Sequence, residues 1–394
     1  MTGFLLVSHP LGDGTEAHVQ DLTRHLLAEG ARVFTARPHP PHSGHFLLTD
    51  HAGLVLSDIP PLSVHDDPAG LLAVLDDLGV TRVHIHHLLQ FGLDAPGYFT
   101  ALAQGWRVRV DMTLHDYLPV CPQVTLIDMR MSFCGLQDPP HCQDCVDRLG
   151  SFLDGPVDVA AWRAANVALM RSVTALIAPS HDLARRMQPF LAGRPIMVRE
   201  HATRPDLARA LAAPPCHRER VPGGRHVAVL GSLSMPKGAR LLHGTAQAAL
   251  AAGLDLRFTV IGVTVRDDLF AGLPNMTITG AYPPGEVLAR IADAAPDLIW
   301  LPSVWPETFC YTLTEAVAAG VMPVVADLGA QADRLRSIGW GQIMPQAMMT
   351  DPEAAAAFLA GCEITAPPKG ARAMLIRSFP GSAAYYAPDQ AGRN

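Results

Sequence analysis

The chain has 394 residues, with 30 basic and 37 acidic side chains and a formal net charge of −7. This length allows two or three domains, and the mildly acidic balance argues against a nucleic-acid-binding protein, which carries an excess of basic surface. With 49% hydrophobic and 17% charged residues, the chain is globular rather than disordered. Because no apolar run has the roughly 20 residues of a membrane span and the first residues lack a signal peptide's features, we expect a cytoplasmic protein.

Short apolar runs alternate with helical patterns along the whole chain. The predicted strands are 4–7, 32–36, 82–86, 108–112, 174–178, 226–231, 257–262, 297–301 and 322–327. The predicted helices are 15–29, 157–172, 181–191, 238–252, 284–294 and 312–319. Continuous apolar runs are typical of parallel strands buried on both faces. Their alternation with helices predicts doubly wound α/β sheets.

The alternation occurs twice, which predicts two Rossmann-like domains facing a central cleft. The expected N-terminal domain is 1–203, with a cysteine-rich insertion at about 119–150. A stretch rich in proline, arginine and glycine, 204–224, is the expected linker to a C-terminal domain at 225–375. The tail, 376–394, is expected to return to the first domain. Ligands of such sheets bind beyond the carboxyl ends of the strands.

The first strand leads into a glycine loop at the start of a helix. Gly12 and Gly14 allow a ligand to approach the helix N-terminus, whose N–H groups attract an anion or a sugar hydroxyl. An ordinary tight turn is the competing interpretation. Ala17 replaces the third glycine of the dinucleotide fingerprint, so a nicotinamide cofactor is not expected.

The second half carries stronger patterns. The strand 226–231 ends at Gly231, and Lys237 precedes a helix, an arrangement that can hold a phosphate although it lacks the spacing of a P-loop. Further on, Glu307 and Glu315 flank the start of another helix. A carboxylate at Glu315 can accept two hydroxyl hydrogen bonds from a ribose.

Between these two glutamates, the backbone amides of Thr308, Phe309 and Cys310 can hold a diphosphate at the helix start.

The string PETFCYTLTEAVAAGVMPVV resembles the E-x7-E signature of the retaining glycosyltransferases of family 4, which have the GT-B fold. The resemblance extends over nearly the whole chain. LGDGTEAHVQDLTRHLLAEG is similar to their N-terminal glycine loop, DMTLHDYLPVCP to the loop with a donor-facing histidine, ALIAPSHDLARRM to the last strand and helix of the first domain, and GSLSMPKG to their phosphate loop. Within the family, the chain most resembles bacterial enzymes of O-antigen or exopolysaccharide assembly.

The resemblance implies a metal-independent hexosyltransferase that moves a sugar from a UDP- or GDP-linked donor to a glycan or lipid-linked acceptor. The implied catalytic residues are His115, Lys237 and Glu307. The implied donor-binding residues are Gly12, Gly14, Gly231, Ser232, Lys237, Thr308, Phe309, Cys310 and Glu315. Many relatives have an arginine where this chain has Ser232, so one bidentate phosphate partner is absent.

Four of the seven cysteines, Cys121, Cys134, Cys142 and Cys145, follow the His115 loop with the spacing C-x12-C-x7-C-x2-C. Four thiolates with a terminal C-x2-C are typical of structural zinc. Zinc would also stabilise an insertion that has no core pattern of its own. Free thiols, two disulfides, an iron–sulfur cluster, or zinc with His141 in place of one thiol stay open.

The histidines of the third predicted strand allow two interpretations. His84 and His86 share one strand face and form either a metal pair or part of the edge of the core.

The function of the whole chain also allows more than one interpretation. The fold suits a nucleotide-sugar epimerase, a phosphorylase, or a non-catalytic module that binds sugar nucleotides or zinc. Peripheral contact with the inner face of a membrane is compatible with a lipid-linked acceptor, and no residue encodes the base, the sugar or the acceptor in a readable way.

Overall fold

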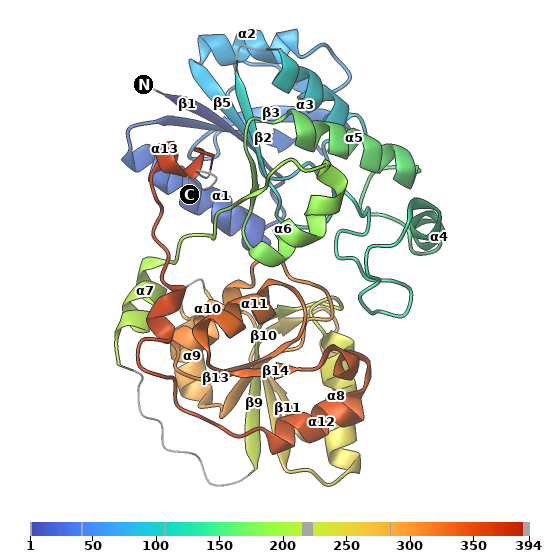
Figure 1. The fold of residues 1–394 in the computed structure, drawn as a ribbon, viewed down its shortest axis with the longest axis vertical. Coiled ribbons are helices and arrows are strands. Elements are labelled where there is room, and N and C mark those ends of the chain that lie inside the picture. The colour runs from blue at the N-terminus through green and yellow to red at the C-terminus, as the bar shows by residue number, and fades with distance from the viewer. Residues whose placement is uncertain (1, 41, 106–107, 215–223, 284, 389–394) are drawn as a thin grey trace. The chain divides into compact units, whose positions relative to one another are not determined.

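The computed structural model describes residues 2–40, 42–105, 108–214, 224–283 and 285–388. The chain divides into two compact units, each with its own sheet (Figure 1). Unit 1 consists of Met1–Leu126, Gly135–His201 and Phe379–Asn394, and unit 2 of Ile127–Cys134 and Ala202–Ser378. Part of the predicted cysteine-rich insertion therefore belongs to unit 2.

Unit 1 is built on a sheet whose described strands run in the order β4-β3-β2-β1-β5-β6-β7-β8. The strands are β1 (Gly3–Val7), β2 (Arg32–Pro38), β3 (His45–Asp50), β4 (Leu62–Ser63), β5 (Val80–Ile85), β6 (Arg109–Thr113), β7 (Leu176–Ala178) and β8 (Met197–Val198). All neighbours pair in parallel except at the edge, where β3 and β4 are antiparallel. The strand order reverses between β1 and β5, the point where such sheets bind ligands.

Helices connect the parallel strands of unit 1. They are α1 (Asp13–Ala28), α2 (Ala69–Asp77), α3 (Ala95–Gln104), α4 (Pro139–Leu149), α5 (Val159–Ser172), α6 (His181–Met187), the 3-10 turn η1 (Gln188–Leu191) and α13 (Ser382–Tyr385). Val19, Leu22 and Leu26 recur at helical spacing on α1 and are buried against Phe4 and Leu6 of β1. This apolar stripe fixes which face of α1 the sheet covers.

The C-terminal segment packs onto unit 1, with α13 beside α1 (Figure 1). The amide of Ser382 donates to Glu29 Oε1 (3.0 Å), just past the end of α1. The Tyr386 hydroxyl lies 2.9 Å from Nδ1 of His84, and its ring stacks on Phe4 at 6.0 Å between centroids. The last described turn is thus part of the core of unit 1.

Unit 2 contains a sheet of described strands in the order β11-β10-β9-β12-β13-β14, all paired in parallel. The strands are β9 (Arg225–Leu233), β10 (Leu256–Thr264), β11 (Met276–Ile278), β12 (Leu298–Leu301), β13 (Met322–Ala326) and β14 (Gln342–Met344). Here the order reverses between β9 and β12. The positions of β12 and β13 and the middle of β9 are apolar and buried, as expected for strands covered on both faces.

The helices of unit 2 are α7 (Pro205–Ala212), α8 (Ala239–Ala251), α9 (Val287–Ala294), α10 (Tyr311–Ala318), α11 (Gly329–Ile338) and α12 (Pro352–Gly361), with 3-10 turns η2 (Asp267–Phe270), η3 (Gln346–Thr350) and η4 (Arg372–Leu375). Helix α7 lies inside the predicted linker 204–224. Its Leu207 and Leu211 are buried in the core of unit 2, so this part of the segment is packed structure. Residues 215–223 of the same segment lie outside the described residues.

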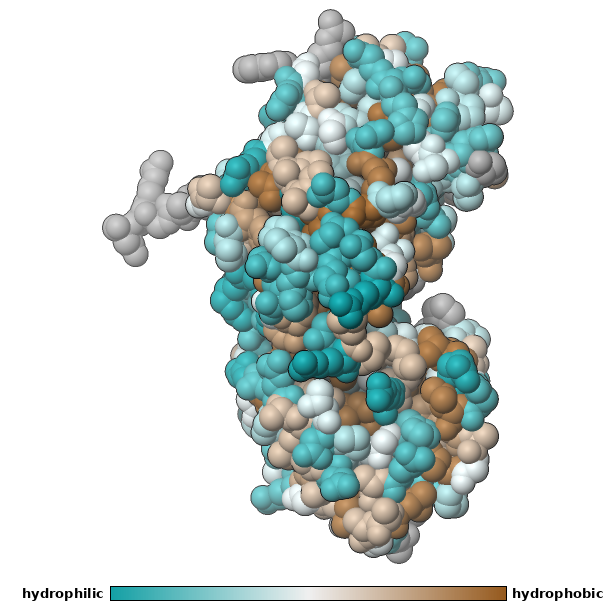
Figure 2. Space-filling model, turned by 90° about the vertical axis from the view of Figure 1, so that its right-hand side faces the viewer, coloured by the Kyte–Doolittle hydropathy of each residue, from teal (hydrophilic) through white to brown (hydrophobic). Residues whose placement is uncertain are grey.

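The predicted alternation of buried parallel strands and helices is confirmed in both units. Several boundaries differ from the predicted ones; at the second glycine turn, for example, β9 continues past Gly231 to Leu233. Among the described helices, none is both long enough and apolar enough to cross a bilayer. On the face in Figure 2, apolar residues are interspersed with hydrophilic ones, as is usual on protein surfaces.

We expect Tyr386→Phe to destabilise unit 1, because the substitution removes the partner of a buried imidazole nitrogen of His84. The expected cost is about 1–3 kcal/mol, the penalty for an unsatisfied buried polar group. Native-state hydrogen exchange of the β5 amides measures it. Ser382→Ala, which removes an exposed contact, is the control with an expected loss below about 0.5 kcal/mol. Equal protection in Tyr386→Phe and the wild type contradicts the prediction.

Candidate functional site

The carboxyl ends of β9 and β12 form the switch point of the unit 2 sheet. Gly231 and Ser232 are near the end of β9, and the loop that carries Glu307 follows β12. The amide of Val304 donates to the Pro236 carbonyl (2.9 Å), which joins this loop to the one that carries Lys237. The chain therefore brings the predicted phosphate loop and the predicted sugar-binding loop side by side.

Two glycines allow the adjoining helices to approach the Glu307 loop closely. Gly238, the N-cap residue of α8, has φ 94°, and a Cβ there would lie 2.2 Å from the Pro302 carbonyl oxygen. Gly329 starts α11 with φ 73°, and a Cβ there would lie 2.7 Å from the Glu307 nitrogen. Only glycine suits both the backbone angle and the space. The loop is consequently held between two helix N-termini.

A buried arginine orients the start of α10. Arg334 Nη1 donates to the carbonyls of Phe309 and Cys310, both at 2.9 Å, and its guanidinium lies 4.0 Å from the centroid of the Phe309 ring. Nη2 donates to Thr314 Oγ1 (2.8 Å). In a trans peptide the carbonyl and the following N–H point in opposite directions. The amides of Cys310 and Tyr311 are therefore turned away from Arg334.

Cys310 is the N-cap residue of α10 and has a left-handed backbone with φ 67°. Burial, with the nearby Glu307 carboxylate, raises the pKa of the Cys310 thiol, so this sulfur is a neutral, packed group. Glu307 itself is buried, and Ser303 Oγ donates to its Oε1. That hydroxyl fixes the carboxylate within the loop.

Glu315 lies on α10, and its burial is sufficient to shift the pKa of its carboxyl group. Burial raises the pKa of its carboxyl group to about 7, although the cations of Arg204 and Lys237 oppose this shift. Arg204 Nη1 lies 3.5 Å from Glu315 Oε1 and Nη2 pairs with Asp206 at 2.8 Å. At neutral pH the group is therefore close to its change of charge, and a ligand that donates hydroxyl hydrogens favours the ionised form.

Three residues around this site were not found from the sequence: Arg204, Tyr282 and Arg334. Arg204 falls in the predicted linker, and Arg334 is on a helix that carries no recognised motif. Burial is the main cause that raises the pKa of Tyr282 to about 12, and the negative charge of Glu315 adds to it. The hydroxyl of Tyr282 therefore stays a hydrogen-bond donor. No local pattern marks these residues, because their roles depend on tertiary contacts.

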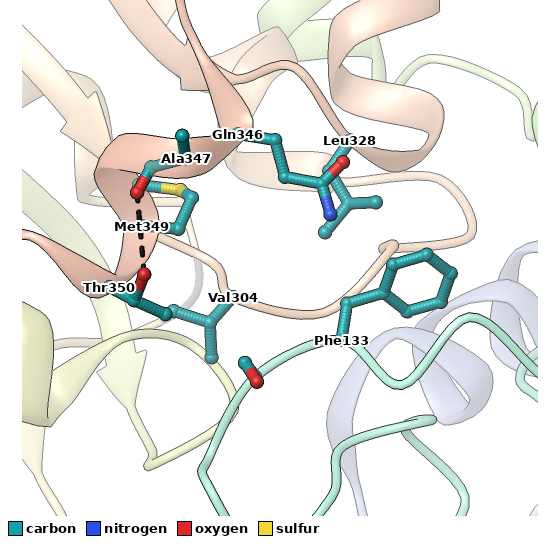
Figure 3. Close-up of a pocket in the computed structure, with 8 residues that line it drawn as sticks. Phe133, Val304, Leu328, Gln346, Ala347, Met349 and Thr350 are labelled. Atoms are coloured by element: carbon teal, nitrogen blue, oxygen red, sulfur yellow. Dashed lines mark hydrogen bonds between the residues drawn. The ribbon is translucent and has the colours of Figure 1, made fainter.

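A pocket of about 320 Å³ adjoins the Glu307 loop within unit 2 (Figure 3). Its lining residues are Ser132, Phe133, Val304, Leu328, Gln346, Ala347, Met349 and Thr350. Figure 3 shows the Phe133 ring, Leu328 and the Gln346 side chain on one side of it, with Val304 and Thr350 opposite. Val304 shares a loop with Glu307, and Leu328 directly precedes Gly329. The pocket thus offers mixed apolar and amide surface next to that loop.

The predicted residues of unit 1 lie at the switch point of its own sheet. Gly12 is the N-cap residue of α1 with φ 81°, and Gly14 lies in the first turn of that helix. His115 follows β6 and is buried, with Nε2 3.1 Å from Nδ1 of His86. Burial lowers the pKa of His115 well below its usual value, so the ring is neutral at physiological pH.

The four cysteines are divided between the units: Cys121, Cys142 and Cys145 belong to unit 1 and Cys134 to unit 2. Arg163 Nη2 donates to the Cys142 sulfur at 2.9 Å. Within the described residues, the structure brings together three other candidate metal ligands, which are His18, His86 and His115. Zinc at the cysteines stays a prediction.

Comparison with protein-family models and with curated proteins finds no significant match to this chain. Solved structures do match over nearly the full length. Sucrose-phosphate synthase from Thermosynechococcus elongatus has 16% identity and a TM-score of 0.58, with 95% of each chain covered. Anabaena HepE in complex with UDP-glucose has 15% identity and a TM-score of 0.52, covering 92% of this chain and 90% of that one.

TarM of S. aureus, in complex with fondaparinux, alpha-GlcNAc-glycerol and UDP, has 9% identity and a TM-score of 0.56, covering 94% of this chain and 96% of that one. At such identities the likeness shows the fold alone. The predicted GT-B fold, with two Rossmann-like α/β domains, is confirmed.

We expect Glu315→Gln to stabilise unit 2 above pH 7. The raised pKa means that the folded state keeps a proton that the unfolded chain loses near pH 4.5, so stability falls as the pH rises from about 4.5 to about 7. Glutamine has no such loss, and the variant should gain about 3 kcal/mol relative to the wild type between pH 4 and pH 8. Urea unfolding followed by tryptophan fluorescence measures this.

Glu286→Gln is the matched control, because Glu286 is an exposed partner of Arg290 on the same unit. It should show no pH-dependent gain. A difference between wild type and Glu315→Gln that does not change with pH contradicts the raised pKa.

Proposed function

We propose that this chain is a retaining glycosyltransferase that moves a sugar from a nucleotide-diphosphate sugar to a glycan or lipid-linked acceptor without a catalytic metal. The observation that carries the proposal is the grouping at the unit 2 switch point. A lysine loop, an oriented helix N-terminus, the buried carboxyl group of Glu307 and the largely buried one of Glu315 meet there. These are the groups that a diphosphate, a ribose and a sugar require.

The donor's charge is the first requirement. The charge of Lys237 opposes the rise in the pKa of Glu315, so a cation is present near this carboxyl group of α10. The amides of Cys310 and Tyr311 point away from Arg334 and provide the partial positive charge of the helix N-terminus. Lysine and amides together would hold the diphosphate, and they would stabilise the negative charge that grows on it as it leaves.

The remaining donor groups have separate roles. Glu315 would accept hydrogen bonds from the ribose hydroxyls, and Glu307 from hydroxyls of the transferred sugar. Arg204 lies beside Glu315 and supplies a cation to this site. This matters because the chain has Ser232 where many relatives have an arginine. The HepE and TarM structures, described with UDP-glucose and with UDP, support a uridine nucleotide as the first donor to test.

The bond from the anomeric carbon to the phosphate oxygen breaks while a bond to the acceptor oxygen forms. In a retaining reaction the acceptor attacks from the face of the leaving group, and its hydroxyl proton passes to the departing phosphate oxygen. No protein nucleophile is required, so catalysis rests on positioning and charge stabilisation. The roles of His115, Gly12 and Gly14 toward the donor stay predictions from the resemblance.

We expect Lys237→Ala to lower kcat by about 100-fold to 1,000-fold, because it removes a stabilising charge that matters most in the transition state. The assay is release of UDP or GDP from a panel of nucleotide sugars with glycan acceptors. Lys369→Ala is the matched control, since both lysines lie in the same pentapeptide, Pro-Lys-Gly-Ala-Arg, and Lys369 is exposed elsewhere on unit 2.

Unchanged turnover in Lys237→Ala contradicts its role in catalysis. Two further outcomes point to different functions. An epimerised nucleotide sugar without transfer indicates an epimerase, and donor binding without turnover on any acceptor indicates a non-catalytic module. Activity that persists after chelation of divalent cations supports the metal-independent mechanism.

A structural zinc ion at the cysteines is a separate proposal. We expect protein purified without chelators to hold zinc on thiolates of the predicted set, so that Cys142→Ser/Cys145→Ser contains about one zinc per chain less than the wild type. Elemental analysis of the wild type and of Cys142→Ser/Cys145→Ser measures it. Far less than one zinc in the wild type, or the same content in both proteins, contradicts a cysteine site.

A further inference from the structure

Three histidines from separate elements converge at the switch point of the unit 1 sheet. His18 comes from α1, His86 directly follows β5, and His115 follows β6. All three are buried, and each has a nitrogen within 4.8 Å of those of the other two. Because α1, β5 and β6 are fixed by the core of unit 1, this grouping is part of the fold.

The spacing is close to that of imidazoles on one metal ion. Nδ1 of His86 and Nε2 of His115 are 3.1 Å apart. Two imidazole nitrogens on a tetrahedral zinc ion, each about 2.0–2.1 Å from the metal, are about 3.3 Å from one another. The His18 ring centroid lies 5.4 Å from that of His86 and 5.2 Å from that of His115. The nitrogens of all three rings lie within 4.8 Å of one another, so they converge on one point of unit 1.

The three rings are in the form that binds metals. Burial lowers the pKa of His18 to about 3 and holds the pKa values of His86 and His115 well below their usual range. Neutral imidazoles present lone pairs, whereas imidazolium ions cannot coordinate. Nε2 of His86 is buried and has no hydrogen-bond partner in the described part of the chain. The His86 ring is thus not tied to the surrounding protein by a second hydrogen bond.

His84, the other histidine of the predicted pair, is different. Its Nδ1 lies 2.9 Å from the Tyr386 hydroxyl and its Nε2 lies 2.8 Å from Thr113 Oγ1. Both nitrogens are therefore used within the core, although its ring is only 4.0 Å from that of His86. The structure separates a core histidine from three histidines that face one another.

Neighbouring aromatic groups hold the His18 ring in place. His201 stacks on it with 4.0 Å between centroids, and the Tyr385 hydroxyl lies 3.4 Å from its Nε2. These two contacts fix the orientation of the His18 ring within unit 1.

We propose that His18, His86 and His115 form a binding site for a divalent transition-metal ion of the zinc and cobalt class. Three nitrogen ligands suit such ions, whereas magnesium and calcium prefer oxygen ligands. Three protein ligands also leave a fourth coordination position for water or a ligand. The site is separate from the cysteine cluster. It includes His115, which the resemblance implies for catalysis, but metal binding is tested without reference to the proposed transferase activity.

Titration of the full-length, chelator-treated protein with Co²⁺ tests the site directly. The Cys142→Ser/Cys145→Ser background reduces the contribution of thiolates, which give strong near-ultraviolet charge-transfer bands with cobalt. We expect one equivalent of Co²⁺ to bind with visible bands of a four- or five-coordinate ion and without the thiolate bands. His18→Gln and His86→Gln, made separately, should weaken binding more than about tenfold.

His181→Gln, at an exposed position of unit 1, is the matched control and should bind cobalt as the parent does. Circular dichroism and gel filtration establish that each variant is folded. A folded His18 or His86 variant that binds cobalt as tightly as the parent overturns the proposal. So does a parent protein that shows no such visible bands, whatever the variants do.

Discussion

The reversal of strand order in each parallel sheet is the constraint on which the rest of the structure depends. Parallel strands end at the same edge, and at a reversal the connecting segments diverge, which leaves space for polar groups. In unit 2 the reversal lies between β9 and β12, and in unit 1 between β1 and β5. The chain places a lysine loop, a helix N-terminus and two carboxyl groups at the reversal in unit 2, and neutral histidines at the reversal in unit 1. The two units therefore differ in chemistry although they share an architecture.

The central parallel strands were predictable from the sequence because they are continuous apolar runs. The strands at or next to the sheet edges were not predicted, since short or partly exposed strands lack that signal; they are β3, β4, β8, β11 and β14. Helix α7 falls within the predicted linker because proline and arginine dominate its surroundings. The pentapeptide Pro-Lys-Gly-Ala-Arg shows the limit most clearly, since it occurs twice. At 236–240 it lies at the switch point, and at 368–372 its arginine, Arg372, donates to the carbonyls of Val317 and Ala318 at the end of α10.

The candidate donor site was predictable to a similar extent. Gly231, Lys237, Glu307 and Glu315 could be named from their positions after strands and before helices. Arg334 could not, because its importance comes from contacts with carbonyls 24 and 25 residues away in the chain. The same holds for the His18, His86 and His115 group, whose members are joined only by folding. Sequence patterns identify segments that carry chemistry, and tertiary contacts decide which side chains meet.

The central claim is that unit 2 binds a nucleotide diphosphate at its switch point. A crystal structure of the protein soaked with UDP or GDP tests it most directly. The account predicts the ribose hydroxyls on Glu315, and the phosphates against Lys237 and the amides of Cys310 and Tyr311. A nucleotide bound away from the carboxyl ends of β9 and β12, for example at the histidine edge of unit 1, would contradict it.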